Sequence, residues 1–140
     1  MISSPYKRAI QTVQGIAESR DKNIQIVDGF KERKLSTEPI DDFHLAIHKV
    51  WEDEQFAWEG GESNLVAQQR GLEAMYHVLE TYHNQNIVIG THGNIMVLIM
   101  NYFDQQYDFS FWSSLDMPDI YCLRFDGREL KEVKRVWNKG

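Results

Sequence analysis

Hydrophobic residues recur at helical spacing near the start of the chain, where they form one apolar stripe. The stripe consists of Tyr6, Ala9, Ile10, Val13, Ile16 and Ala17. This spacing predicts a helix, for which Ser4 is a suitable N-cap and Pro5 a suitable first residue. The next segment, residues 23–28, is rich in β-branched side chains and predicts a strand.

Two further helices are predicted in the middle of the chain. Residues 41–52 carry apolar side chains on one side, which predicts a short helix within a less regular insert, residues 30–61. We expect this insert to act as a lid. A Gly-Gly pair ends it, and Ser63 is then placed to cap a long helix. The buried stripe of that helix comprises Leu65, Leu72, Met75, Leu79 and Tyr82.

Residues 87–90 form a short apolar run without polar alternation, which is typical of a parallel strand covered on both faces. The run stops at the sequence THGN, residues 91–94, where a helix begins at once. Two more strands, 120–125 and 129–137, are joined by an Asp-Gly hairpin turn. This order predicts one α/β domain, residues 1–140, built as a three-layer α/β/α sandwich with a mostly parallel sheet.

Composition narrows the classes of function. The 15 basic and 21 acidic residues give a net charge of −6 without a basic run, which argues against a nucleic-acid or anionic-membrane surface. The longest apolar stretch, residues 95–100, is too short to span a bilayer. Cys122 is the only cysteine, and its apolar neighbours predict an inert core thiol. His44 and His48 have the spacing of metal ligands, but no third ligand is apparent, so we predict a solvated helix face and no metal or cofactor. We also predict a cytoplasmic protein.

Candidate catalytic and ligand-binding residues follow the predicted strands, at the sheet edge where α/β proteins bind ligands. His92 and Gly93 open a helix N-terminus, which favours an anion; a structural histidine is the alternative. Arg8 lies in the first turns of a helix, where a cation is unfavourable unless an anion lies nearby, so it is a candidate phosphate ligand. A solvated surface arginine is the alternative. Glu32 is a candidate general acid, with a solvated carboxylate as the alternative.

Four segments, taken in order, resemble the histidine phosphatase superfamily, which includes the cofactor-dependent phosphoglycerate mutases. They are SSPYKRAIQT, GFKERKLS, GGES and IVIGTHGN. The resemblance implies that Arg8 and His92 bind phosphate, that Gly93 offers its N–H to it, and that Glu32 donates a proton. Ser36 stands where many members have glycine. The implied activity is hydrolysis of a phosphorylated small molecule through a phosphohistidine, because the short insert favours a phosphatase over a mutase.

The family's first motif is not found in this sequence. Members begin with a strand that ends in arginine-histidine-glycine, whose histidine takes the phosphoryl group, and no such triplet occurs in these 140 residues. We therefore expect a truncated, inactive chain that lacks its first central strand, or alternatively a pseudoenzyme that binds a phosphorylated ligand or a protein partner. Neighbouring strands, or a second copy in a homo-oligomer, are expected to close the gap. A late gene start, a frameshift or a cloned fragment would give the same sequence.

Overall fold

The computed structural model of the chain describes residues 1–116 and 118–136, and its centre is a small parallel sheet. Strand β1 (Ile2–Ser3) lies between β2 (Gln25–Ile26) and β3 (Ile89–Gly90) and pairs with both in parallel. The N–H groups of Ile2 and Ser4 donate to the carbonyls of Val88 and Gly90 at 2.9 and 2.8 Å. Because the strands are parallel, their carboxyl ends meet at one edge, as the sequence predicts.

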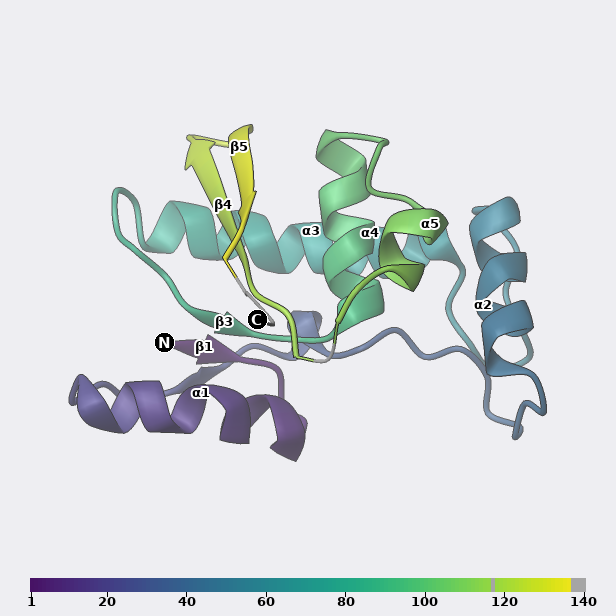
Figure 1. Cartoon of the computed structure of the whole chain (residues 1–140), viewed down its shortest axis with the longest axis horizontal. Coiled ribbons are helices and arrows are strands. Elements are labelled where there is room, and N and C mark those ends of the chain that lie inside the picture. Colours follow the sequence, from purple (N-terminus) through teal and green to yellow (C-terminus); the bar gives the residue numbers. More distant parts are fainter. Residues whose placement is uncertain (117, 137–140) are drawn as a thin grey trace.

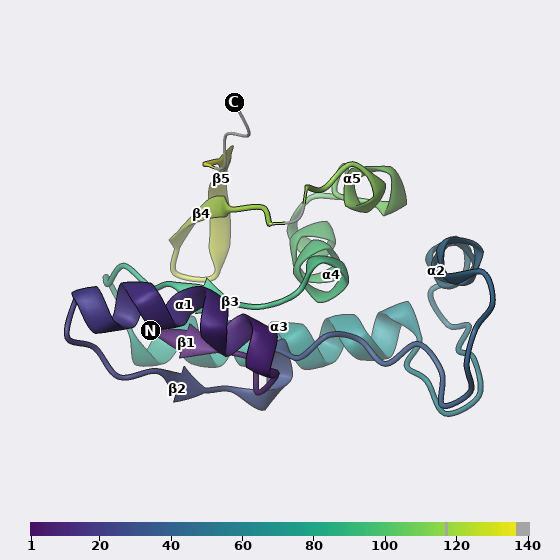
Figure 2. The same cartoon turned by 60° about the horizontal axis from the view of Figure 1, so that its bottom comes forward.

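Helices cover both faces of this sheet, which confirms the predicted α/β/α sandwich (Figures 1 and 2). Helix α1 (Lys7–Ser19) packs on one face through Ala9, Val13 and Ala17. Helices α3 (Asn64–Thr81) and α4 (Gly93–Phe103) pack together on the other side. The main core lies on this second side and consists of Ile2, Phe30, Ala67, Leu72, Ala74, Val78, Ile95, Leu98 and Ile99.

Side chains cap three of the later helices, but not the first. The Ser63 hydroxyl accepts a hydrogen bond from the Val66 N–H at 3.1 Å at the start of α3, as predicted. Helix α2 (Phe43–Glu52) begins behind Asp42, whose carboxylate accepts from a backbone N–H. Helix α1 has Tyr6 at its N-cap position with no side-chain cap, so the prediction that Ser4 caps it is wrong. The Ser4 hydroxyl has a different partner, described below.

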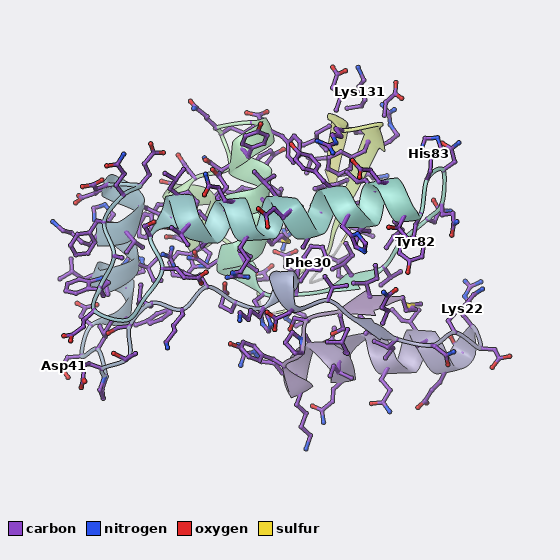
Figure 3. The ribbon with its side chains drawn as sticks, turned by 180° about the vertical axis from the view of Figure 1, so that it is seen from behind. Lys22, Phe30, Asp41, Tyr82, His83 and Lys131 are labelled. Atoms are coloured by element: carbon purple, nitrogen blue, oxygen red, sulfur yellow. The ribbon has the colours of Figure 1, made fainter. Side chains whose placement is uncertain are left out.

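The chain leaves β2 earlier than predicted and forms a 3₁₀ turn at Asp28–Phe30. Gly29 permits this turn to lie against α3, because a Cβ at this position would be only 2.6 Å from the Cβ of Ala74. Phe30 is 1% exposed and lies between α3 and the strands (Figure 3). The residues that follow are therefore held at the carboxyl edge of the sheet.

The C-terminal part forms a short helix, α5 (Phe109–Ser113), and a separate antiparallel hairpin, β4 (Tyr121–Asp126) with β5 (Glu129–Arg135). The predicted end of the last strand, residue 137, lies outside the described residues. Exposure alternates along β4 and leaves Cys122 on the exposed side, so the predicted core thiol is wrong. The reason is that only one face of the hairpin packs against the rest of the protein, and Cys122 lies on the other face.

Both outer strands of the parallel sheet, β2 and β3, have an unpaired edge among the described residues. Within residues 1–116 and 118–136, β3 pairs with β1 alone, and the two hairpin strands pair with each other. The strands therefore have not moved together to place β4 against β3. In the same residues, the helices are all too short or too polar to cross a membrane.

Candidate functional site

His92 lies two residues after the end of strand β3 and occupies the N-cap position of α4. Its side chain is buried, and its Nε2 atom lies 2.7 Å from the hydroxyl oxygen of Ser4, which follows the neighbouring strand β1. The ring of Tyr6 lies beside the imidazole, with 5.1 Å between ring centroids. The parallel pairing of β1 and β3 thus brings the two N-terminal sides of α1 and α4 together.

Arg8 belongs to the same group of side chains. Its guanidinium carbon lies 5.4 Å from the centroid of the Tyr6 ring, so the arginine and His92 flank one tyrosine. Burial, with a smaller contribution from the charge of Arg8, lowers the pKa of His92 to about 4. The imidazole is therefore neutral at pH 7, and the cation nearby is Arg8, which is exposed to solvent.

Glu32 reaches the same helix end from another direction. Its carboxylate accepts hydrogen bonds from the N–H groups of Asn94 at 3.0 Å and Ile95 at 2.8 Å, and from Arg33 N–H at 2.8 Å. A carboxylate at this position also faces the positive end of the α4 dipole. The Gly93 N–H, by contrast, has no hydrogen-bond partner among the described residues. It remains available to an incoming acceptor.

The pKa of Glu32 is raised above its usual range. Burial is the main cause, and the three backbone N–H groups together with the Arg33 charge oppose it. A raised pKa favours the protonated form that a proton donor needs. Both carboxylate oxygens are nevertheless engaged with backbone N–H groups, so in this arrangement Glu32 has a capping role as well.

A buried arginine next to Glu32 was not anticipated from the sequence. Arg33 is 5% exposed and donates to the Asn64 side-chain oxygen and to the Glu62 carbonyl, with a longer contact of 3.4 Å to Asn94 Oδ1. Burial lowers its pKa to about 10, which leaves the guanidinium charged at neutral pH. Arg33 therefore ties the starts of α3 and α4 together.

The structure thus joins the predicted residues in two groups at one helix end. Arg8 and His92 both lie against Tyr6 on the side of α1, whereas Glu32 lies with the Arg33 network and contacts α4 through backbone N–H groups. Gly93 lies between His92 of the first group and Asn94, whose N–H donates to Glu32 of the second. The contribution of Ser4 was missed, because its adjacent proline makes it a typical N-cap.

The comparison with protein families decides the assignment. The sequence profile of the histidine phosphatase superfamily, branch 1, matches residues 1–139. The chain belongs to this superfamily. No protein of curated function matches it significantly in sequence.

Solved structures share the fold of this histidine phosphatase chain. A mycobacterial glucosyl-3-phosphoglycerate phosphatase in complex with inorganic phosphate matches with a TM-score of 0.68 at 16% identity, over 99% of this chain and 75% of that chain. YhfR from Bacillus stearothermophilus matches with a TM-score of 0.70 at 20% identity, over 93% of this chain and 69% of that chain. Mycobacterial hydrolase 1 matches with 0.63 at 17%, over 82% of this chain. This chain spans only 62% of mycobacterial hydrolase 1 and 55% of mycobacterial hydrolase 2.

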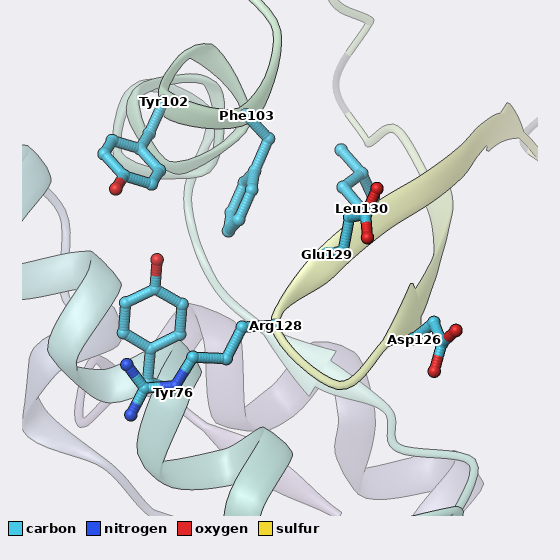
Figure 4. A pocket seen from close by; sticks show the side chains of 7 residues that line it. All are labelled: Tyr76, Tyr102, Phe103, Asp126, Arg128, Glu129 and Leu130. Atoms are coloured by element: carbon cyan, nitrogen blue, oxygen red, sulfur yellow. The ribbon is translucent and has the colours of Figure 1, made fainter.

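Two described pockets of this histidine phosphatase chain lie away from His92. One, of about 840 Å³, lies between helices α3 and α4 and the hairpin, and Arg128 stacks on Tyr76 beside it (Figure 4). The other, of about 590 Å³, lies along α2 and includes Trp58. His44 is exposed and the His48 side chain is 45% exposed, as predicted for a solvated helix face, and both rings also contact Phe109 of α5 edge-on.

Helix α5 in turn lies next to the start of α4. The indole nitrogen of Trp112 is 3.6 Å from the position that a Cβ on Gly93 would occupy. The Trp112 ring also contacts His44, at 6.1 Å between centroids. Helix α2 of the insert is therefore linked to the Gly93 end of α4 through Trp112, in addition to the hydrogen bonds that Glu32 accepts from α4.

Proposed function

We propose that residues 1–140 of this histidine phosphatase chain bind a phosphorylated small molecule at the carboxyl edge of the sheet and do not turn it over on their own. The observation that carries the proposal is the position of His92, at the N-cap of α4, with Arg8 and a free Gly93 N–H beside it. Helix N-termini and arginine forks are suited to phosphate oxygens.

The parent reaction is hydrolysis of a phosphomonoester through a phosphohistidine, in which His92 and Gly93 would hold the phosphoryl group. Arg8 would balance its negative charge from the exposed side. Glu32 would protonate the leaving oxygen, a role that requires one carboxylate oxygen to release its N–H donor on α4. A nucleophile is the part that these residues do not supply, because no arginine-histidine-glycine triplet occurs among them.

The size of the expected loss follows from hydrogen-bond energies. A second arginine and a nucleophilic histidine would add at least two charge-assisted bonds to the phosphate, at roughly 1.5–3 kcal/mol each. Without them, phosphate binding is expected to be about a hundred-fold to ten-thousand-fold weaker than in a complete site.

The test combines a binding titration with a turnover assay. Inorganic phosphate is titrated into the chain and into His92→Ala, with His83→Ala as a matched control at an exposed histidine outside the site. We expect binding that His92→Ala abolishes and His83→Ala preserves, and no hydrolysis of p-nitrophenyl phosphate. Equal binding by all three would refute the site. Hydrolysis that needs His92 and no metal would refute the non-catalytic proposal.

A second chain is the alternative source of the missing groups, and the open edge of β3 favours this candidate. In this form a homo-oligomer, or a partner protein, would place a strand beside β3 and complete a phosphatase site. Sedimentation analysis tests the homo-oligomer: a monomer at all concentrations excludes it. We also propose that residues 30–61 form a lid, because α2 contacts α5 beside Gly93. The proposed location of the protein is the cytoplasm.

A further inference from the structure

Ser4 is the only side chain with a hydrogen bond to His92 in the part of the chain that the structure describes. The serine is fully buried, with 0% exposure, and its hydroxyl oxygen has two neighbours. One is the Nε2 atom of His92 at 2.7 Å, and the other is the backbone N–H of Tyr6, which donates to the hydroxyl at 3.2 Å. Ser3, the preceding residue, is equally buried and donates to the Ser4 carbonyl instead.

The direction of the bond to His92 follows from an account of the hydrogens. A serine hydroxyl has one hydrogen to donate and can accept through its lone pairs. The Tyr6 N–H already donates to Ser4, and among the described residues Nε2 of His92 is the only acceptor near the serine hydrogen. If Nε2 carried a hydrogen, the buried Ser4 hydroxyl would have two donors and no acceptor, which is costly for a buried group.

We infer that Ser4 sets the tautomer of His92, so that Nε2 accepts the serine hydrogen and the ring's own hydrogen resides on Nδ1. This positioning role rests on the proposed phosphate site. Nδ1 has no hydrogen-bond partner among the described residues, so its N–H is free to donate to a phosphoryl oxygen. With the opposite tautomer, Nδ1 would present a lone pair to the anion and repel it.

The tautomer is measured directly by nitrogen-15 NMR of the imidazole in the phosphate-free chain at neutral pH. The wild-type chain is expected to show His92 protonated at Nδ1. Ser4→Ala removes the donor, and Ser3→Ala removes an equally buried hydroxyl that has no contact with the ring. We expect Ser4→Ala alone to shift the ratio toward the Nε2–H form. Binding of inorganic phosphate should weaken about fivefold, the factor that one ordinary hydrogen bond supports.

The outcomes separate this inference from the proposed function. An Nε2–H tautomer in the wild-type chain, or equal spectra for Ser4→Ala and the wild type, overturns the role of Ser4 even if His92 binds phosphate. A shift of tautomer in Ser4→Ala without any phosphate binding supports the role of Ser4 and refutes the proposed phosphate site. The wild-type spectrum decides the first point without any variant, so a failure of Ser4→Ala to fold does not block the test.

Discussion

Replacement of Glu32 by alanine tests whether its carboxylate holds the start of α4. The change leaves three backbone N–H groups, those of Arg33, Asn94 and Ile95, without their acceptor. It also removes the carboxylate charge that acts most strongly on the buried guanidinium of Arg33. A hydrogen bond contributes about 1 kcal/mol net, and a charge at a helix N-terminus about 0.3–1 kcal/mol. The expected loss of unfolding free energy is therefore about 3–4 kcal/mol.

Urea unfolding followed by circular dichroism measures this loss. Glu32→Gln keeps one carbonyl acceptor and nearly the same volume, so it should cost less, about 1–2 kcal/mol. Glu73→Ala, at an exposed position of α3, is the matched control and should change stability by less than about 0.5 kcal/mol. If Glu32→Ala costs no more than the control, the carboxylate does not cap α4.

Two further predictions concern stability. The pKa of His92 is about 4 in the folded chain and about 6.5 in the unfolded chain. Between these pH values only the unfolded chain binds the proton, so the free energy of unfolding should fall by up to about 3 kcal/mol as the pH drops from 6.5 to 4. In His92→Gln that part of the pH slope should vanish, and equal slopes in urea titrations would contradict the assignment. Gly71→Ala would place a Cβ 2.8 Å from Ile99 and should cost about 1–3 kcal/mol. Gly15→Ala, with open space around it, should stabilise α1 by about 0.5–1 kcal/mol, and a loss of stability at both glycines in thermal melts would refute this packing.

The fold could be predicted where the signal is local. The Ser63 cap depends on an N–H three residues away, and the apolar run before His92 predicts a strand from its own composition. The parallel arrangement follows because each strand is separated from the next by a helical segment. These features need no knowledge of distant contacts.

The site was harder to predict because its contacts are long-range. Ser4 meets a residue 88 positions away, and that contact outweighs its preference for a helix cap. Glu32 and its N–H donors on α4 are 62 and 63 positions apart. The burial of Arg33 depends on Asn64 and Asn94, which only the packed helices bring together. Sequence patterns indicated the candidate site residues, but not the distant partners that hold their side chains.

The hairpin of β4 and β5 is attached to the rest of the molecule by few contacts. An exposed ion pair joins Arg128 to Glu80, and Phe125 meets Phe103 with 5.3 Å between ring centroids. Two strands alone are barely stable in water, and exposed ion pairs contribute little. The hairpin should therefore detach in rare local openings while helices α1, α3 and α4 stay folded, which makes strands β4 and β5 the first target of a protease.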